Sequence, residues 1–335
     1  MKEKPLKDLV RTIRLKKIPF SAVFEITDRC NLRCLHCYQG IEGKGELTFT
    51  QIKSVLDDLE KLGSLKLTLT GGEPTLREDF IEIYFYCHQK KFATTLFTNG
   101  TLLHSGLRKA ILGKPPFRVE CSLYGASGKT HDSITGMDGS FDNTFRNIEW
   151  MVQKGIPLVV KSVILSLNVH EMEALSNLCH RLGVTFHPTL RIFPSRDPHR
   201  SPERLRLKTE EIIHFRKKKK QAGYNKLREP DPSPEEFICN AGREACSISA
   251  DGKVYPCVAL RWECGDLKKT SFHQIWFHSP ILEKIRSYQE KDFRDCLHCQ
   301  WKVRCNFCPG MGFSEEGDML IPSREICRLT KTNFE

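Results

Sequence analysis

Three closely spaced cysteines near the start of the chain are the residues best suited to do chemistry. They are Cys30, Cys34 and Cys37. No further cysteine occurs before Cys87. Three neighbouring thiolates fit an iron–sulfur cube held at three corners, with an open fourth iron available for a reaction. A zinc site that uses His36 as fourth ligand is the alternative. We expect the tight turn between the cysteines to point this histidine away, which favours the cluster.

A second and denser set of cysteines occupies the last third of the chain. Four of them form the run Cys296-x2-Cys299-x5-Cys305-x2-Cys308. This spacing suits a zinc site as well as a cluster, because thiolates bind both. Residues 248–255 alternate around an Asp-Gly pair, which predicts a β-hairpin with a two-residue turn. The hairpin would bring Cys239 or Cys246 beside Cys257, so local structure would build part of a metal site.

The total of fifteen cysteines favours metal ligation over disulfides, since the number is odd and no apolar secretion signal follows Met1. Cys87, Cys121 and Cys179 stand singly inside apolar stretches. We expect these three to be packed thiols. No run of eighteen apolar residues occurs either, so we expect a cytoplasmic protein without a membrane segment.

The positive charge is concentrated in one part of the chain. The formal net charge is +11, and residues 191–228 hold thirteen Lys or Arg against four Asp or Glu, a local balance of +9. This segment should attract anions. Within it, a helix over 208–223 would carry the run Arg216-Lys217-Lys218-Lys219-Lys220. A solvated helix face is favoured over a binding patch for that run.

The first half of the chain alternates short apolar runs with helical stretches, which predicts βα units around a parallel sheet. We expect strands at 22–27, 65–70, 93–98, 117–123, 157–164 and 184–190. We expect helices at 5–18, 50–62, 77–91, 102–112, 141–154 and 170–182. The fold class is therefore α/β, a partial (β/α)6 TIM-like barrel with a smaller cysteine-rich C-terminal domain that contains a β-hairpin. The expected domains are a helix within 1–20 that covers the barrel end, the barrel at 21–190, a basic linker at 191–238 and the C-terminal domain at 239–335.

Marked residues follow the predicted strands, at the sheet edge where parallel βα folds bind ligands. Gly71-Gly72-Glu73-Pro74 follows the second strand. There the glycines would let backbone carbonyls approach a ligand, and the acid would attract an ammonium group. Thr98-Asn99-Gly100 ends the third strand, and Ser122 ends the fourth. Taken singly, an Asn-Gly pair can be an ordinary turn and a serine can bond its own backbone.

Taken together, these motifs resemble those of the radical S-adenosylmethionine (radical SAM) enzymes. The resemblance implies that the three-cysteine loop holds a [4Fe-4S] cluster, whose open iron binds S-adenosylmethionine. It also implies cofactor contacts by the Gly-Gly-Glu-Pro loop, Thr98, Asn99 and Ser122. Many relatives have Asp where Tyr124 stands and Arg where Thr135 stands. These departures leave open how the cofactor carboxylate is held; a hydroxyl could replace the guanidinium there, at the loss of a charged pair.

The C-terminal cysteines resemble the SPASM module, which holds two auxiliary [4Fe-4S] clusters. The resemblance implies one cluster on Cys296, Cys299, Cys305 and Cys327. It implies another on Cys239, Cys257 and Cys308, with Cys246 or Cys264 as candidate fourth ligand. This sequence has only two residues between the last two cysteines of the run, where relatives usually have three, so the placement of Cys308 is the less secure.

The resemblance implies three [4Fe-4S] clusters and reductive cleavage of S-adenosylmethionine to a 5′-deoxyadenosyl radical. The first hypothesis is hydrogen abstraction from a peptide or protein, with an electron donor such as flavodoxin or ferredoxin. A small anionic molecule is the second, with nucleic acid as a less favoured partner. A zinc or electron-transfer protein without catalysis is the third. Glu25, Glu120 and His187 could face the barrel interior, although such residues are more often solvated or paired, and no general base is identified.

Overall fold

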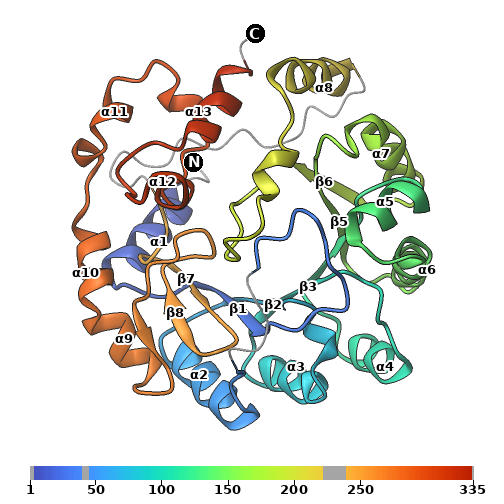
Figure 1. Ribbon diagram of the computed structural model, residues 1–335. Helices are drawn as coiled ribbons and strands as arrows, with labels where there is room; N and C mark the ends of the chain where they lie inside the picture. The colour runs from blue at the N-terminus through green and yellow to red at the C-terminus, as the bar shows by residue number, and fades with distance from the viewer. Residues whose placement is uncertain (1–3, 40–44, 222–238, 334–335) are drawn as a thin grey trace.

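The computed structural model describes residues 4–39, 45–221 and 239–333 (Figure 1). The strands are β1 (Ser21–Thr27), β2 (Lys66–Gly71), β3 (Ala93–Thr98), β4 (Arg118–Ser122), β5 (Leu158–Val163), β6 (Thr185–Thr189), β7 (Ala245–Ile248), β8 (Lys253–Tyr255) and β9 (Gly265–Asp266). The helices of the first half are α1 (Lys4–Leu15), α2 (Phe49–Lys61), α3 (Phe80–Gln89), α4 (Ser105–Gly113), α5 (Gly128–Thr135), α6 (Ser140–Gln153) and α7 (Met172–Arg181). The later ones are α8 (Thr209–Gln221), α9 (Phe272–His278), α10 (Pro280–Ser287), α11 (Arg294–Leu297), α12 (Pro309–Glu316) and α13 (Arg324–Lys331). Short 3-10 helices are η1 (Pro74–Leu76), η2 (Val169–Glu171), η3 (Pro202–Leu205), η4 (Glu290–Asp292) and η5 (Lys302–Arg304).

The strands form one sheet in the order β6-β5-β4-β3-β2-β1-β7-β8-β9. Each neighbouring pair from β1 to β6 is parallel. Within the described residues, β6 and β9 are the two edges of the sheet, so it does not close. This arrangement confirms the expected α/β fold with an open barrel, and each of the six predicted strands is found within one residue at either end.

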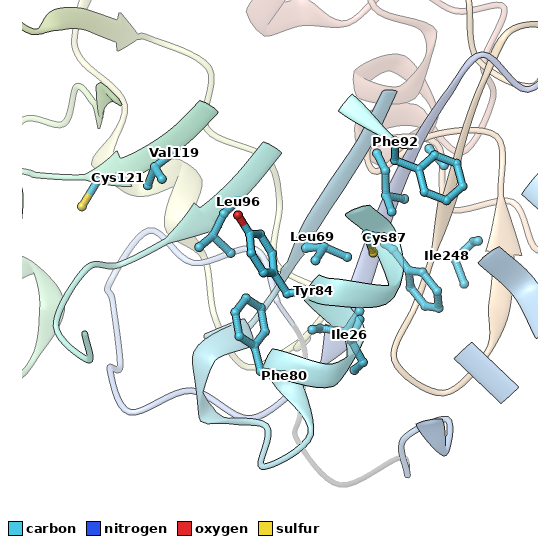
Figure 2. Packing of buried hydrophobic residues seen from close by; sticks show 14 of the residues in the cluster. Ile26, Leu69, Phe80, Tyr84, Cys87, Phe92, Leu96, Val119, Cys121 and Ile248 are labelled. Carbon is cyan, nitrogen blue, oxygen red and sulfur yellow. The ribbon is translucent and has the colours of Figure 1, made fainter. Parts of the chain in front are cut away.

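The alternation of side chains in β1 separates the helix side of the sheet from the barrel interior. Ala22, Phe24 and Ile26 are fully buried on the helix side. Glu25 and its alternate neighbours point the other way. Figure 2 shows Ile26 and Leu69 packed against the aromatic rings of α3. Burying a large apolar side chain of this kind stabilises the fold by about 1.5–3 kcal/mol, so the core lies between the sheet and its outer helices.

Helix α2 begins with a capping box. Thr48 accepts a hydrogen bond from the Gln51 backbone N–H, and the Gln51 side chain accepts one from the Thr48 N–H. This capping box satisfies two donors that the first turn leaves without partners. The helix then buries Ile52, Leu56 and Leu59 against the sheet. It thereby returns the chain from the cysteine loop to β2.

The C-terminal hairpin is present and continues the barrel sheet. Strand β7 pairs in parallel with β1, and β8 pairs with β7 in antiparallel fashion. The predicted two-residue turn is wrong. Ser249 and Lys253 are still hydrogen-bonded across the hairpin, and the Gly252 N–H donates to the Ser249 carbonyl. The loop therefore has three residues, a common hairpin type built on a type I turn.

Other expectations need correction. The helix predicted from residue 77 begins at Phe80, because Pro74–Leu76 forms a separate 3-10 turn. Helix α5 was not predicted, since its polar sequence shows no apolar stripe. The basic linker contains η3 and also the helix expected within it, α8; its Arg206 bonds Glu315 at 3.0 Å, so this part packs on the C-terminal helices. Its remainder, residues 222–238, lies outside the described residues, as does the predicted end of α8.

Among the described residues, the helices are all too short or too polar to span a bilayer.

Candidate active site

The cysteine loop follows β1 directly and brings its three thiols together. The Cys37 N–H bonds the Cys34 carbonyl at 3.1 Å, which closes the turn between them. Burial, together with the charges of nearby Glu73 and Cys37, raises the pKa of the Cys30 thiol to about 11. Burial also raises the pKa of Cys34, and the charges of Cys37 and Cys30 add to this effect. The three sulfurs are thus close enough to interact electrostatically.

Hydrogen-bond donors and a cation oppose the rise in the pKa of these thiols. The Leu32 N–H points at the Cys30 sulfur at 3.4 Å, and the Asn99 amide lies 4.0 Å from the same atom. Arg200 donates to the Cys34 carbonyl, and its charge lowers the pKa of Cys34 and Cys37 against the effect of burial. Hydrogen bonds to cluster sulfurs tune iron–sulfur sites, so these residues fit a thiolate-ligated cluster.

The His36 ring is held by packing against another aromatic ring rather than by a hydrogen bond from its buried Nδ1. Its ring meets that of Tyr124 edge-on at 4.4 Å, and its Nδ1 is buried without a partner among the described residues. Burial and the charge of Arg200 lower its pKa to about 4, so the ring is neutral. No three His, Cys, Asp or Glu side chains in the described ranges converge on a single-ion site. The cysteines of a cube bind different iron atoms and need not converge.

The loop after β2 docks onto the backbone just before Cys30. The Gly72 N–H bonds the Thr27 carbonyl at 2.9 Å, and the Glu73 N–H bonds the Arg29 carbonyl at 2.8 Å. A Cβ atom on Gly72 would lie 2.2 Å from the Arg29 carbonyl oxygen. The two glycines are therefore required for close contact between loops, whereas the sequence had suggested an approach to a ligand.

Glu73 joins this loop to the end of β3. Its carboxylate is fully buried and accepts hydrogen bonds from the Thr98 hydroxyl at 2.8 Å and the Asn99 N–H at 2.7 Å. The backbone and hydroxyl of Thr75 supply two more, and buried Pro74 starts the 3-10 turn between them. Burial raises the pKa of Glu73, and these bonds oppose the rise. The acid predicted to bind the cofactor therefore also connects the loop after β2 to the end of β3 by hydrogen bonds.

Asn99 extends this hydrogen-bonded connection into the cysteine loop. Its amide nitrogen donates to Asn31 at 2.9 Å, and Asn31 donates in turn to the Thr101 hydroxyl at 2.9 Å. The side-chain oxygen of Asn99, Oδ1, accepts from the backbone N–H and the hydroxyl of Thr101. The ends of β2 and β3 and the loop with Cys30 therefore form one hydrogen-bonded unit.

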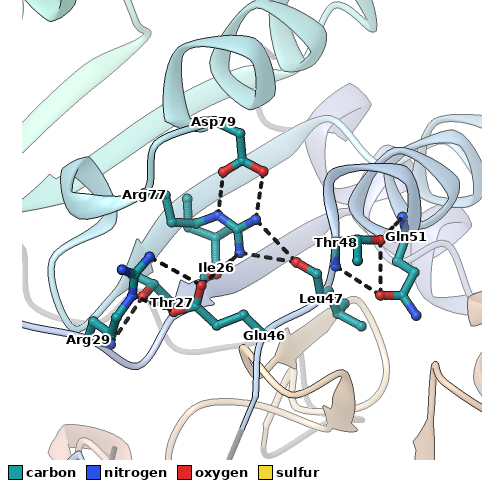
Figure 3. A network of polar contacts seen from close by, with 9 residues as sticks. All are labelled: Ile26, Thr27, Arg29, Glu46, Leu47, Thr48, Gln51, Arg77 and Asp79. Atoms are coloured by element: carbon teal, nitrogen blue, oxygen red, sulfur yellow. Dashed lines mark hydrogen bonds and ion pairs between the residues drawn. The ribbon is translucent and has the colours of Figure 1, made fainter. Parts of the chain in front are cut away.

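A second polar network holds the entrance and exit of the cysteine loop (Figure 3). Arg77 forms two bonds with Asp79 at 2.8 and 2.7 Å and donates to the carbonyls of Ile26 and Leu47. Glu46 receives Arg29 at 3.2 Å and also the Thr27 hydroxyl. The arginine side chain is almost fully buried and paired, so it fixes the end of β1 against the chain that leads into α2.

The residues after β4 lie over the cysteine loop. Tyr124 is buried, its ring stacks on His131 at 5.6 Å, and burial together with the Cys34 charge raises the pKa of its hydroxyl. A hydrogen bond with Ser122 partly opposes that rise. Thr135 is fully buried, and its hydroxyl bonds the Ser140 hydroxyl at 2.7 Å. The contact predicted between Thr135 and the cofactor stays a prediction. The Thr135 hydroxyl is already hydrogen-bonded within the turn between α5 and α6.

Three supporting residues were not identified from the sequence. Arg196 and Arg200 come from the segment read as a linker, and they reach Glu25 and the Cys34 carbonyl. The position of that segment directly after a barrel strand was the available signal. Glu171 accepts hydrogen bonds from the N–H groups of Ala126 and Ser127, at 2.7 and 3.1 Å. It holds the loop that carries Tyr124. Glu120, whose role was left open, pairs with Lys161 at 2.8 Å.

The C-terminal cysteines gather into two groups. The first is Cys296, Cys299, Cys305 and Cys327, whose thiols act electrostatically on one another. Burial, together with the charges of the other three members, raises the pKa of Cys296 to about 11. The Thr330 hydroxyl donates to the Cys305 sulfur at 3.3 Å. These four are the residues predicted to share one auxiliary cluster.

The second group is Cys239, Cys257 and Cys308. Burial raises the pKa of Cys257 to about 12, and the charges of Cys239 and Cys308 contribute. The Leu260 N–H donates to the Cys257 sulfur at 3.2 Å. The short spacing before Cys308 does not prevent it from joining this group.

The two candidates for a fourth ligand differ in position. Cys264 is 8% exposed and acts electrostatically with Cys257. Cys246 lies in β7 and acts electrostatically with Cys264; both cysteines belong to the main apolar core. The single thiols Cys87 and Cys121 are fully buried and Cys179 nearly so, as expected.

Two family profiles match the chain. That of the Radical SAM superfamily covers residues 24–181, and that of SPASM, an iron–sulfur cluster-binding domain, covers 239–300. These domains imply [4Fe-4S] clusters and S-adenosylmethionine as cofactors.

Individual proteins match over most of the chain. The AdoMet-dependent heme synthase of Methanosarcina barkeri is 27% identical over 336 residues, which cover 92% of this chain and 96% of that protein. The antilisterial bacteriocin subtilosin biosynthesis protein AlbA of Bacillus subtilis is 28% identical, covering 94% and 72%. The structure of Streptococcus suis SuiB bound to precursor peptide SuiA is similar in fold, with a TM-score of 0.74, 17% identity and coverage of 97% and 80%. The chain therefore belongs to the radical SAM superfamily, as an enzyme with a C-terminal SPASM iron–sulfur cluster-binding domain.

Proposed function

We propose that this enzyme abstracts a hydrogen atom from a peptide or protein substrate. The bound cluster and S-adenosylmethionine supply the chemistry, a 5′-deoxyadenosyl radical formed by reductive cleavage. The observation that carries the proposal is the hydrogen-bonded unit of the cysteine loop, Glu73 and Asn99, because it fixes three thiols beside the strand ends that carry the cofactor motif. Such positioning, with exclusion of water, is the protein's share of the work.

The chain's residues divide the cofactor contacts among them. Cys30, Cys34 and Cys37 would hold the catalytic cluster. Glu73 is the proposed acceptor for the ammonium group of the cofactor, since its Oε2 accepts a hydrogen bond from Asn99 and a carboxylate oxygen can accept two. Gly71, Gly72 and Pro74 shape this loop, and Thr98, Asn99, Ser122 and Tyr124 line the adjoining strand ends. Thr135 would act indirectly, by holding the turn between α5 and α6.

We propose two auxiliary clusters, which makes three in all. The first would use Cys296, Cys299, Cys305 and Cys327. The second would use Cys239, Cys257 and Cys308 with Cys264 as fourth ligand, because Cys264 and not Cys246 acts electrostatically with another member. An auxiliary cluster could accept the electron left on the substrate. The reductant would be a protein such as flavodoxin or ferredoxin.

A peptide substrate is supported by the similarity to the bacteriocin biosynthesis protein and by the fold shared with SuiB. A second candidate is a small anionic molecule, a tetrapyrrole. It is favoured by the heme synthase of Methanosarcina barkeri, which this chain matches over 96% of its length. Both candidates use the same radical and the same barrel interior, so they differ in the substrate alone.

Anaerobic enzyme reconstituted with iron and sulfide would test both parts. Incubation with S-adenosylmethionine and dithionite should give 5′-deoxyadenosine in wild type and none in Cys30→Ala. Peptide libraries deuterated at carbon and Fe-coproporphyrin III deuterated in its propionates would then be supplied separately. Deuterium in 5′-deoxyadenosine from a peptide supports the proposal, and deuterium from the porphyrin alone supports the second candidate. Absence of 5′-deoxyadenosine from iron-replete wild type would refute the catalytic role.

A further inference from the structure

A buried carboxylate inside the barrel faces two arginines. Glu25 of β1 is 2% exposed. Arg196 makes two bonds with it, at 2.7 and 3.1 Å, and Arg261 makes one at 3.4 Å. We call these three residues the Glu25 cluster. It lies beside the cysteine loop, because the Arg196 backbone N–H donates to the Tyr38 carbonyl at 3.0 Å and its guanidinium donates to the Gln39 side chain at 2.6 Å.

The cluster joins parts of the chain that are far apart in sequence. Arg196 follows β6, and in Figure 1 this segment, drawn in yellow, reaches into the middle of the ring of strands. Arg261 follows β8 of the C-terminal hairpin. The Arg196 guanidinium lies 5.0 Å from the ring centre of Tyr38, and that of Arg261 lies 3.6 Å from the ring centre of Tyr255. Aromatic faces stabilise guanidinium groups and fix their orientation.

Hydrogen bonding within the cluster is incomplete. A guanidinium has five N–H donors. Toward the described residues, Arg261 makes the single long bond to Glu25, and its side chain is 22% exposed. The Nε atom of Arg196 is buried without a partner in the same ranges. The cluster therefore has donors available beside the cysteine loop.

The charges in the cluster do not balance. One carboxylate faces two guanidinium groups, which leaves a single positive charge in a largely buried place, and such charges need a partner. Two acids act on Tyr255 beside Arg261, but among the described residues they bond a lysine and a serine rather than the cluster's arginines. Glu263 bonds Lys253 at 3.0 Å, and Asp251 accepts from the Ser249 hydroxyl. Arg200 adds a further positive charge at the loop.

The cofactors would not neutralise this excess. A [4Fe-4S] cluster with a 2+ core and three thiolates has a net charge of about −1. S-adenosylmethionine carries a sulfonium, an ammonium and a carboxylate, about +1 in total. Their sum is close to zero, so together they leave the net positive charge in place, and an anionic group of the substrate would balance it.

We propose that Arg261, with Arg196, binds a carboxylate group of the substrate. The inference rests on the proposed radical reaction in this barrel and names the chemical class of what enters it. The carboxylate could belong to an acidic peptide side chain or to a tetrapyrrole propionate. Glu25 holds the two guanidinium groups in place and competes with the substrate for them.

The test is equilibrium binding to the cluster-loaded enzyme with S-adenosylmethionine and no reductant, so that no turnover occurs. One pair of probes is fluorescein-labelled hexaglutamate and hexaglutamine. The other is Fe-coproporphyrin III and its tetraamide. Wild type should bind at least one carboxylate probe about tenfold more tightly than its neutral partner, and Arg261→Gln should remove that preference. Arg324→Gln removes an equal charge at a residue 85% exposed and should change nothing. The probe pair that shows the preference identifies the source.

Glu25→Gln separates substrate binding from a purely structural role. If the arginines bind the substrate, removal of the competing carboxylate should tighten carboxylate binding by about tenfold. If the two arginines have only a structural role, Glu25→Gln should bind every probe as tightly as wild type or more weakly, and that result would overturn the inference. Unchanged carboxylate preference in Arg261→Gln would overturn it too. Cleavage of S-adenosylmethionine by wild type tests the proposed reaction separately. Cleavage without any preference for carboxylates sinks this inference alone.

Discussion

The backbone N–H of Asn99 donates a hydrogen bond of 2.7 Å to the buried carboxylate of Glu73. Glu73 lies two residues after β2 and Asn99 directly after β3, so this bond ties the loops that follow two neighbouring strands. Asn99 also bonds Asn31 in the cysteine loop at 2.9 Å. A disturbance at Glu73 should therefore reach the cluster ligands through two hydrogen bonds.

Glu73→Gln is the first prediction. Glutamine keeps the shape but replaces one acceptor oxygen with a donor, which would face the N–H of Asn99 or the hydroxyls of Thr75 and Thr98. A buried donor left without a partner costs about 1–3 kcal/mol. Urea unfolding of the apoprotein should show a loss of that size, and 5′-deoxyadenosine formation should fall. The exposed Glu82→Gln is the control, and an unchanged unfolding midpoint for Glu73→Gln would contradict this connecting role of Glu73.

The barrel strands could be predicted because their signal is local. Alternating or apolar runs such as residues 93–98 read the same in isolation as in the fold, and their spacing by helices dictates a parallel sheet. Helix α5 has no such stripe and depends on tertiary contacts from Glu171, so no sequence window could show it. The parallel pairing of β7 with β1 joins residues far apart in the chain and has no local signature.

The candidate site also has residues that the sequence could predict and residues that it could not. Cysteine spacing and strand-end motifs point to the residues near the cofactor, because the chemistry demands those residue types. The arginine partners of Glu25 are 171 and 236 residues away in sequence, and nothing in a local pattern pairs an acid with a distant arginine. The role of Gly72 was also hidden, because its close neighbour is the backbone of Arg29 and not a ligand.

Gly72→Ala is the second prediction. The added Cβ would lie 2.2 Å from the Arg29 carbonyl oxygen, a backbone atom that cannot move without shifting the cysteine loop. We expect a destabilisation of about 1–3 kcal/mol and a lower iron content per chain. Gly113→Ala is the matched control, since no atom lies within 4 Å of its added Cβ at the end of α4. That variant should be neutral or more stable by up to about 1 kcal/mol. Equal thermal denaturation of both variants would refute the close-contact explanation.

Cys264→Ala and Cys246→Ala form the third prediction. If Cys264 is the fourth ligand of the second C-terminal group, its loss should lower the iron content by up to about four atoms per chain and change the electron paramagnetic resonance signal of one reduced cluster. Cys246→Ala removes a sulfur from the apolar core, so it should lower the stability of the protein and leave its iron content unchanged. Iron loss from Cys246→Ala with none from Cys264→Ala would reverse the assignment.

The fourth prediction concerns acid and the support of the loop after β4. Burial raises the pKa of Glu171, but hydrogen bonds from Thr130, Ser127 and Ala126 outweigh it and lower the pKa below its ordinary 4.5. A carboxyl whose pKa is lowered by folding stabilises the folded protein fully above the unfolded value and loses that contribution as the pH falls through the folded one. The stabilisation by Glu171 should therefore be complete above about pH 5 and disappear progressively below 4.5.

Glu171→Gln makes this contribution measurable. The variant should unfold about 1–2 kcal/mol more easily than wild type at pH 7, because charge-assisted bonds to the N–H groups of Ala126 and Ser127 become neutral ones. The difference should shrink as the pH is lowered below 4.5, since wild type then loses the same charge. Urea unfolding of the apoprotein avoids loss of clusters in acid, and the exposed Glu173→Gln serves as control. If the difference in unfolding free energy between the variant and wild type stays constant from pH 7 to pH 3, the charge of Glu171 does not hold the loop that carries Tyr124.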